Sequence, residues 1–177
     1  MNKSFDLDGA IRKIPDFPKP GILFYDITGI MLDPRAFRYC IDTMKELYAD
    51  KKIEAVAAIE ARGFIFAAPY ALEEELPLIL VRKKGKLPGK TLSSSYSLEY
   101  GEAEIEVQQS DVQPNQNILV VDDLFATGGT VAAACSMLEE AGARVEQIFG
   151  VVGLPFLPYE KTLEKYTVTT LVNYDSE

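Results

Sequence analysis

The fold depends on the stretch Ile118-Leu119-Val120-Val121-Asp122-Asp123-Leu124-Phe125-Ala126-Thr127-Gly128-Gly129-Thr130. Its first four residues are apolar without alternation, which is typical of a strand covered on both faces in a parallel sheet. Two carboxylates end the strand, and small, hydroxyl-bearing residues follow at once. In open α/β sheets ligands bind at the carboxyl ends of such strands. We therefore expect a buried strand, a ligand-binding turn and the start of a helix.

The turn has the composition of a phosphate-binding loop. Gly128 and Gly129 lack a Cβ, so the backbone can curl and point successive N–H groups into one concavity. Thr127 and Thr130 add hydroxyl donors. The helix that starts here adds about 0.3–1 kcal/mol through its positive end. Each hydrogen bond to a charged group adds about 1.5–3 kcal/mol, so the converging donors outweigh the helix dipole.

The two acids that precede this loop need a different partner. Carboxylates repel phosphate and accept hydrogen bonds from hydroxyl groups. Asp122 and Asp123 therefore fit the hydroxyls of a sugar such as ribose.

Length and composition indicate one globular domain. The chain has 177 residues, 47% hydrophobic and 25% charged, which are ordinary values for a soluble domain. Its net charge of −9 argues against a surface for duplex nucleic acid, which is normally basic. Histidine is absent, so any proton transfer must use Asp, Glu, Lys or Tyr.

The cysteines and the amino terminus favour a cytoplasmic protein. Cys40 and Cys135 match no metal or redox spacing, and each lies on the apolar face of a predicted helix, so we expect buried thiols in a reducing compartment. Asp6 and Asp8 lie where a signal peptide would be apolar. No run approaches the roughly 20 apolar residues of a membrane span, so we expect no membrane partner.

Hydrophobic spacing predicts the elements before the central stretch. We expect a short amphipathic helix over residues 5–14, a strand or hairpin arm over 22–27 and a helix that begins at Pro34. A second strand covers 53–59. Pro69 would cost the following helix a hydrogen bond, so we expect that helix to begin near Ala67 or Ala68.

The remaining elements complete an α/β pattern. Residues 78–81 predict a third buried strand, residues 87–100 a loop rich in Ser, Gly and Pro, and residues 103–107 an exposed hairpin arm. A helical stripe from Val131 ends at Gly142, and strands follow over 145–152 and 168–172. Strand-then-helix units in this order predict a parallel sheet.

Two further strand ends carry charge. Glu60-Ala61-Arg62-Gly63 is either a solvated salt-bridging turn or an anion-binding turn that uses Arg62. The run Arg82-Lys83-Lys84-Gly85-Lys86 is either a solvated loop or a site for a polyanion such as pyrophosphate. In a doubly wound sheet these strand ends share one edge with the central stretch. Phosphoribosyl pyrophosphate carries the phosphate, the vicinal hydroxyls and the second dense anion that they require together.

Two common nucleotide-binding motifs fit poorly. A Walker A loop needs a lysine after its glycines, and residues 126–131 contain none. A dinucleotide-binding fingerprint places its acid about 20 residues after the glycines, whereas Asp122 and Asp123 precede them.

The central stretch resembles the signature of the type I phosphoribosyltransferases, in the wording of the members that use adenine. The agreement extends to four more blocks: PDFPKPGILF at 15–24, EARGF at 60–64, RKKGKLPG at 82–89 and SYSLEYG at 95–101. The resemblance implies one domain over residues 1–177, an α/β fold with a mostly parallel central sheet flanked by helices. It further implies a small hood from residues 1–33 and a flexible loop and hairpin from residues 87–107 over the site.

The resemblance also implies a reaction and its partners. Adenine and phosphoribosyl pyrophosphate would give AMP and pyrophosphate in purine salvage, with Mg²⁺ held mainly through substrate oxygens and through water to Asp122 or Asp123. A homodimer is expected, without nucleic acid. Two alternatives stay open: a 6-oxopurine substrate such as hypoxanthine, guanine or xanthine, and a non-catalytic sensor of phosphoribosyl pyrophosphate. Enzymes that use 6-oxopurines resemble this chain only around residues 122–130. The sensor lacks support because this chain has no excess of basic surface residues.

Site roles carry over onto matching positions. Asp122 and Asp123 would hold the ribose hydroxyls or metal-bound water. The 5′-phosphate would bind Ala126, Thr127, Gly128, Gly129 and Thr130. Pyrophosphate would bind Arg62, Lys83 and Lys86, with Arg82 reaching into a neighbouring subunit's site.

The base and the chemistry involve other positions. Phe24 and Leu124 would sandwich adenine, and the backbone near Leu23 would read its Watson–Crick edge. Glu99 would handle the proton at the purine imidazole, with Tyr100 in the closing loop and Arg62 also catalytic. Tyr25 stands where the family often carries arginine, so its role stays open.

Overall fold

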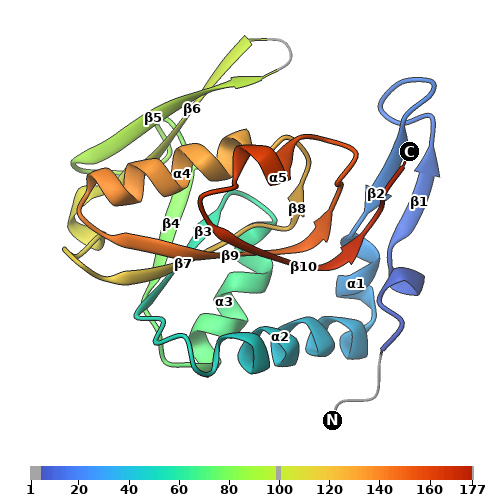
Figure 1. Ribbon diagram of the computed structural model, residues 1–177, viewed down its shortest axis with the longest axis horizontal. Coiled ribbons are helices and arrows are strands. Elements are labelled where there is room, and N and C mark those ends of the chain that lie inside the picture. Colours follow the sequence, from blue (N-terminus) through green and yellow to red (C-terminus); the bar gives the residue numbers. More distant parts are fainter. Residues whose placement is uncertain (1–4, 99–100, 177) are drawn as a thin grey trace.

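The computed structural model describes residues 5–98 and 101–176 (Figure 1). Within these ranges the strands form two sheets, one of two strands and one of eight. In chain order the elements are η1 (Asp8–Ala10), β1 (Arg12–Pro15), β2 (Leu23–Asp26), α1 (Thr28–Leu32), α2 (Pro34–Tyr48), β3 (Ala55–Ile59), α3 (Gly63–Glu73), β4 (Leu78–Lys83), β5 (Thr91–Leu98), β6 (Gly101–Gln108), η2 (Gln109–Asp111), β7 (Asn117–Val121), β8 (Leu124–Phe125), α4 (Gly129–Glu140), β9 (Arg144–Gly153), α5 (Tyr159–Thr162) and β10 (Thr167–Asn173).

The large sheet confirms the predicted α/β fold. Its strand order is β10-β9-β7-β3-β4-β6-β5, and the short β8 pairs with β9. The five strands from β10 to β4 run parallel, while β6 and β5 are antiparallel additions at one edge. Helices α2 and α3 cover one face of the sheet, and α4 and α5 cover the other (Figure 1).

The central strands are buried on both faces, as their lack of alternation predicts. Every residue of β3 and of β7 is buried. In β3, Val56 and Ala58 belong to the core under α2 and α3, while Ala57 and Ile59 belong to the core under α4. Apolar side chains are therefore favoured along both strands, and Asn117, the one polar residue in them, donates its side-chain amide to the Lys51 and Lys52 carbonyls at 3.0 and 3.1 Å.

A topological switch point lies between β3 and β7. The two strands are parallel neighbours, but the helices that follow them, α3 and α4, pack on opposite faces of the sheet. Ligand sites of open α/β folds lie at such a point, beyond the carboxyl ends of the strands. The residues directly after β3 and β7 are therefore placed to meet there.

Helix α3 begins at Gly63 and not near Ala67 or Ala68, so that prediction is wrong. Pro69 lies inside the helix, where it costs about 3 kcal/mol. Tertiary packing outweighs this cost, because burying a side chain such as Phe66 contributes about 1.5–3 kcal/mol and Tyr70 is buried beside it. The early start also requires glycine, since a Cβ on Gly63 would lie 2.8 Å from the carbonyl oxygen of Val121.

The predicted helix over residues 5–14 is also wrong. Only the single turn η1 is helical there, and β1 follows it as an antiparallel partner of β2. The guanidinium of Arg12 contacts the Asp26 carboxylate at 2.6 Å across this pair, a long-range contact that helical spacing cannot reveal. The strand predicted over 22–27 is confirmed as β2. We call β1, β2 and their connecting turn, residues 12–26, the hood hairpin.

The segment predicted as a loop over residues 87–100 contains strand β5, which pairs with β6 along its whole length. The Ser, Gly and Pro content of the segment indicates a loop, and pairing with β6 is what makes residues 91–98 a strand. The prediction that residues 103–107 are exposed is wrong for Ile105 and Val107, which are buried in the core under α4.

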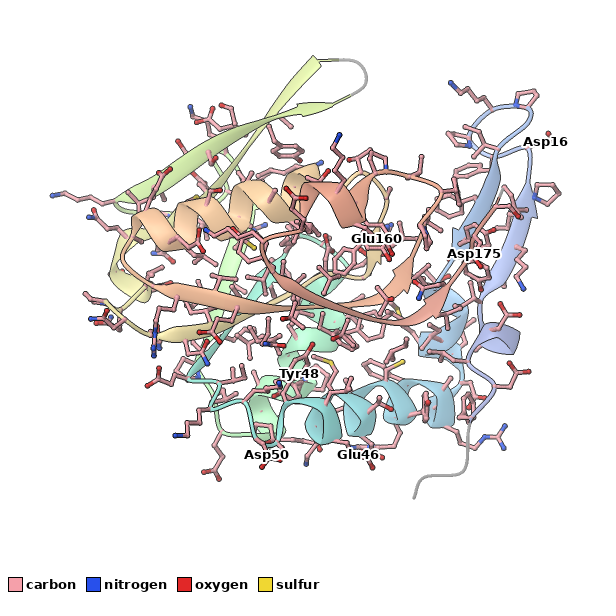
Figure 2. All side chains as sticks on the ribbon, in the orientation of Figure 1. Asp16, Glu46, Tyr48, Asp50, Glu160 and Asp175 are labelled. Atoms are coloured by element: carbon pink, nitrogen blue, oxygen red, sulfur yellow. The ribbon has the colours of Figure 1, made fainter. Side chains whose placement is uncertain are left out.

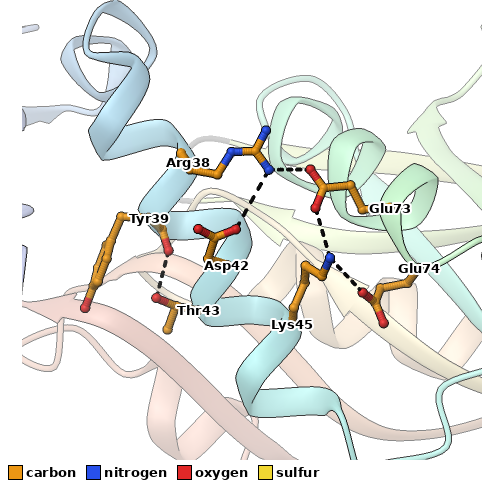
Figure 3. Close-up of polar contacts among 7 residues, drawn as sticks. All are labelled: Arg38, Tyr39, Asp42, Thr43, Lys45, Glu73 and Glu74. Atoms are coloured by element: carbon orange, nitrogen blue, oxygen red, sulfur yellow. Dashed lines mark hydrogen bonds and ion pairs between the residues drawn. The ribbon is translucent and has the colours of Figure 1, made fainter. Parts of the chain in front are cut away.

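Helices α2 and α3 are joined by an ion network across their exposed edges (Figure 3). Arg38 contacts Asp42 and Glu73, while Lys45 contacts Glu73 and Glu74. Exposed pairs of this kind contribute about 0–1 kcal/mol each, so the network mainly supplements the buried contacts. One of these comes from Tyr48, which points from α2 into the core against Tyr70 and Phe149 (Figure 2).

Other helix predictions are confirmed. Helix α2 begins at Pro34, and the Asp33 carboxylate caps it by accepting the Arg35 N–H at 2.9 Å. Cys40 and Cys135 are buried free thiols, and burial raises the pKa of each to about 12. Gly142 follows α4 with a φ of +98°.

Within the described ranges, no helix is long and apolar enough to cross a membrane.

We expect Gly150→Ala to lower stability, because a Cβ on Gly150 would lie 2.6 Å from the ring of buried Phe125. Overpacking of this kind costs about 1–3 kcal/mol, and each kcal/mol lowers Tm by roughly 2–4 °C at this chain length. Thermal melts measure the change. Phe125→Leu makes room, so the double variant should be more stable than the two single losses predict. Simple additivity would contradict the packing argument.

Candidate functional site

Three charged segments meet at the switch point, as the sequence predicts. They follow β3, β4 and β7. Arg62 Nε donates to Asp123 Oδ2 at 2.6 Å, which joins the end of β3 to that of β7. Arg82 Nη2 donates to Glu60 Oε1 at 3.0 Å, which joins the end of β4 to that of β3. Asp122 and Asp123, Arg62, and the basic run from Arg82 therefore form one continuous site.

The backbone of the two acids is tied to the sheet. The Asp122 N–H donates to the Phe149 carbonyl at 3.0 Å. The Asp123 carbonyl accepts the N–H groups of Val151 and Val152 at 3.0 and 3.1 Å. The Asp123 N–H donates to Asp122 Oδ1 at 2.8 Å. Strand β9 therefore fixes the backbone of both residues, while the Asp123 N–H and the Arg62 guanidinium hold their carboxyl groups.

The two acids differ electrostatically, although both residues are buried. Burial raises the pKa of Asp122 well above its usual range, and the adjacent charge of Asp123 raises it further. Asp123 instead has the Arg62 guanidinium against it. Burial lowers the pKa of Arg62, but its hydrogen bond to Asp123 and the nearby acids outweigh this and raise the net pKa. Arg62 therefore faces Asp123, whereas the Asp122 carboxyl tends to keep its proton.

The glycine loop forms a small cavity at the start of α4. Gly128 has a φ of +79°, and a Cβ there would lie 3.2 Å from Leu163 Cγ and from Tyr159 Cα. Glycine is therefore required by both conformation and space. The cavity measures about 100 Å³ and is lined by Asp122, Leu124, Phe125, Ala126, Thr127, Gly128, Gly129, Thr130 and Val131. Its position at a helix amino terminus suits a phosphate group.

The basic run divides into side chains with different partners. Arg82 is tied within its own chain, to Glu60 and to the Lys86 carbonyl at 3.0 Å. Lys84 contacts Glu104 at 2.7 Å. Lys83 and Lys86 are exposed at the end of β4 and in the following turn. Glu60 thus forms the salt bridge that one interpretation predicted, but with Arg82 and not with Arg62.

Two carboxylates that the sequence analysis did not assign hold this turn. Glu60 Oε2 accepts the Lys83 N–H at 3.1 Å. Glu106 is 4% exposed, and its Oε1 accepts the N–H groups of Lys86 and Leu87 at 2.9 and 2.8 Å. Glu60 had a signal, because it lies in the EARGF block. Glu106 had none, because an acid in an alternating strand is normally on the solvent face.

The residues predicted for the base lie on the hood hairpin and on β8. Phe24 is half-buried, and its ring contacts that of Phe17 edge-on at 5.0 Å. Leu124 is half-buried in β8, next to the glycine loop. Asp26 lies close enough to Arg62 to contribute to raising its pKa. Because side chains alternate along a strand, Phe24 and Asp26 lie on the same face of β2, opposite to Tyr25.

Glu99 and Tyr100, the predicted proton handler and its neighbour, lie outside the described residues. Leu98 and Gly101 on either side of them are paired as the ends of β5 and β6.

Comparisons with known proteins agree with this geometry. A family model described as a phosphoribosyl transferase domain matches residues 29–164. An adenine phosphoribosyltransferase of Treponema denticola is 63% identical to this chain over 171 residues, which is 97% of this chain and 90% of the relative. The similarity therefore extends well beyond the motifs to nearly the whole sequence.

Solved structures of the same kind share the fold. The adenine phosphoribosyltransferase of Thermoanaerobacter pseudethanolicus has a TM-score of 0.91 at 41% identity, over 96% of this chain and 98% of that chain. The enzyme of Saccharomyces cerevisiae, complexed with an imino-altritol bisphosphate and adenine, has a TM-score of 0.89 at 35% identity, over 94% and 97% of the two chains.

We expect Asp122→Asn to stabilise the free protein increasingly as pH rises. The folded-state pKa of Asp122 is raised above the unfolded value of about 4, so the wild type loses stability as pH rises from that value through the folded pKa. Asparagine does not titrate and can still accept the Asp123 N–H. Urea unfolding between pH 4 and pH 9 measures the gap between variant and wild type. Asp50→Asn, at an exposed position, is the control, and a pH-independent gap for Asp122→Asn would contradict the assignment.

Proposed function

The chain belongs to the phosphoribosyl transferase family, and we propose that it serves purine salvage by transferring the 5-phosphoribosyl group from phosphoribosyl pyrophosphate to adenine. The products are AMP and pyrophosphate. One observation carries this: the glycine loop (residues 126–130), the buried acids Asp122 and Asp123 and the basic turn (residues 82–86) lie together at the switch point. The adenine phosphoribosyltransferases to which the chain is similar support adenine as the base.

Phosphoribosyl pyrophosphate has a place for each of its parts. The 5′-phosphate enters the cavity at the start of α4, where backbone N–H groups and the Thr127 and Thr130 hydroxyls donate to it. Asp122 and Asp123 accept hydrogen bonds from the ribose hydroxyls. Pyrophosphate takes the exposed ammonium groups of Lys83 and Lys86, together with Arg62.

Arg62 can serve both the acid and the anion. Its Nε is used by Asp123, and its side chain is still 49% exposed, which leaves its other N–H groups for pyrophosphate. Arg82 is held by Glu60 and by the Lys86 carbonyl, which supports a role in shaping the basic turn. Its reach into a neighbouring subunit's site stays a prediction, as do the homodimer and the cytoplasmic location.

Adenine would lie between the hood hairpin and β8. Phe24 stacks on one face of the ring and Leu124 packs on the other. Strand β2 has one edge that does not pair with β1, which supports recognition of the Watson–Crick edge by backbone groups near Leu23. Recognition by backbone groups selects the donor and acceptor pattern of adenine over that of a 6-oxopurine.

The reaction needs positioning and one proton handler. Transfer at the ribosyl carbon passes through an oxocarbenium-like state, so the chain mainly aligns the base with the sugar and stabilises charge. Without histidine, the Glu99 carboxylate handles the proton at the purine imidazole, which typically contributes 10²–10⁴-fold. Closure of the loop that carries Tyr100 excludes water, which would otherwise hydrolyse the sugar pyrophosphate.

The residues of the site fit a Mg²⁺ ion held mainly by the substrate. Mg²⁺ commonly binds one or two carboxylates together with substrate phosphates and water. Asp122 and Asp123 supply that small donor set, and no cluster of three or more acidic, cysteine or histidine ligands occurs among the described residues. When bound, the ion would neutralise charge on the pyrophosphate leaving group.

We expect adenine to be the best purine substrate, on the order of 10²-fold or more ahead of hypoxanthine and guanine in kcat/KM, because an unpaired donor or acceptor is heavily penalised in such a pocket. The protein is incubated with Mg²⁺, phosphoribosyl pyrophosphate and each purine, and nucleotide formation is followed. Faster turnover of a 6-oxopurine would overturn the proposed base. Binding of phosphoribosyl pyrophosphate with no nucleotide formed would favour the sensor.

We expect Glu99→Gln to lower kcat by about 10²–10⁴-fold, with a much smaller change in KM for phosphoribosyl pyrophosphate, because the amide cannot exchange the proton. Steady-state kinetics measure both constants. Glu102→Gln removes the same charge three positions away and should stay near wild type. An unchanged kcat for Glu99→Gln would remove this residue from the chemistry.

A further inference from the structure

The carboxyl end of the chain is docked on the hood hairpin. The ring of Tyr174 stacks on that of Tyr25 in β2, with centroids 3.9 Å apart and planes 15° apart. Tyr25 is 6% exposed and Tyr174 is half-buried, so the stack covers most of the Tyr25 ring. In Figure 1 the last residues run beside β2, and Figure 2 places Asp175 at the same position. Tyr25 therefore has an aromatic packing partner from the carboxyl end of the chain.

Polar contacts hold the stack on both sides. The Tyr174 hydroxyl donates to Asp8 Oδ1 at 2.5 Å, and Asp8 also pairs with Lys13 of β1 at 2.7 Å. The Lys13 ammonium lies 5.3 Å from the centre of the Tyr174 ring, within range of a cation–π contact. The Tyr25 hydroxyl donates to the Ser176 carbonyl at 3.1 Å. Tyr174 thus contacts groups from η1 and from both strands of the hood.

The same residue is bonded to the main sheet. The Tyr174 N–H donates to the Gly153 carbonyl at 3.1 Å, at the end of β9. That strand end also positions β8, because Leu124 pairs with Val152 and Phe125 pairs with Gly153. Both residues proposed as walls of the adenine slot, Phe24 and Leu124, therefore depend on the end of β9 for their position. Leu124 is placed by direct pairing with β9, and Phe24 is placed through Tyr174 and its stack on Tyr25.

The alternation of β2 links the stack to the slot. Tyr25 and Phe24 are adjacent in the strand, so their side chains point to opposite faces. A ring packed behind Tyr25 therefore supports the strand from the side opposite to the base. A two-stranded hairpin is only marginally stable by itself, so its position depends on such external contacts.

We propose that Tyr174 is a positioning residue for the purine base: it holds the hood hairpin at the distance from β8 at which Phe24 and Leu124 can sandwich adenine. The inference rests on the proposed function, since it assigns the slot to adenine. It concerns one substrate only, because the glycine loop, the acids and the basic turn are fixed by other contacts. Loss of the stack should therefore weaken binding of the base and leave phosphoribosyl pyrophosphate binding intact.

The test is the split between the two KM values. Tyr174→Leu should raise KM for adenine roughly 2- to 10-fold, the range that an aromatic pair contributes, with KM for phosphoribosyl pyrophosphate within about twofold of wild type. Tyr174→Phe keeps the ring and loses only the bond to Asp8, so it should rescue most of the effect. Tyr166→Leu removes a part-buried tyrosine of the other core and should leave KM for adenine unchanged.

Amide hydrogen exchange gives a readout that does not depend on the reaction. Tyr174→Leu should speed exchange in residues 23–26 while β3 and β7 stay protected. If the wild type does not use adenine, the proposed function fails, and faster exchange in the hood alone would still support the positioning contact. If adenine is used, and both its KM and hood exchange stay at wild-type values in Tyr174→Leu, the inference is overturned.

A reciprocal variant covers a failure of Tyr174→Leu to fold. Tyr25→Leu removes the other half of the stack and should raise KM for adenine by a similar factor. Where both variants fold, the double variant should show little further increase, because the two changes remove one interaction. If the effects of the two variants instead add, and KM rises equally for adenine and for phosphoribosyl pyrophosphate, the changes loosen the protein generally and the proposal is overturned.

Discussion

The close approach of α3 to the end of β7 is the constraint on which the rest of the site depends. Gly63 brings the start of the helix so near to Val121 and Asp122 that no side chain fits between them. This approach places Arg62 beside Asp123. Because α4 leaves from the other face of the sheet, the glycine loop opens onto the same point. The topological switch point brings these segments to one edge of the sheet, and the absence of a Cβ at Gly63 allows α3 to contact the end of β7.

The electrostatics of the site follow from that contact. Two adjacent carboxyls are buried in a protein without histidine, and the Arg62 guanidinium is hydrogen-bonded to Asp123. The chain therefore keeps a destabilising acid at Asp122, and its backbone bonds to β9 hold the acid in place despite that cost. A sugar hydroxyl or a metal-bound water would give the Asp122 carboxyl a further partner beside the Asp123 N–H. The free site is thus arranged for a ligand at the expense of stability, as is common at functional sites.

The sequence predicts those parts of the molecule that depend on local pattern. Strand β7 is visible because both of its faces are buried, and the glycine loop is visible because its chemistry is contained in a few consecutive residues. The start of α3, strand β1 and strand β5 are not visible in this way. Each is decided by contact with another segment and not by its own pattern: β7 for α3, β2 for β1 and β6 for β5. Glu106 escapes prediction for the same reason, because its burial depends on the turn that folds over it.

The residues that place the binding groups are spread more widely than the groups themselves. The residues proposed for the phosphate and the sugar lie on segments that directly follow sheet strands, so the sheet positions them with little help. The proposed base slot is different, because half of it belongs to a two-stranded hairpin outside the main sheet. Such a hairpin takes its position from whatever packs behind it. Under the proposed function, base selection therefore depends on the carboxyl end of the chain, where the stacked Tyr25 and Tyr174 join the hood hairpin to the main sheet.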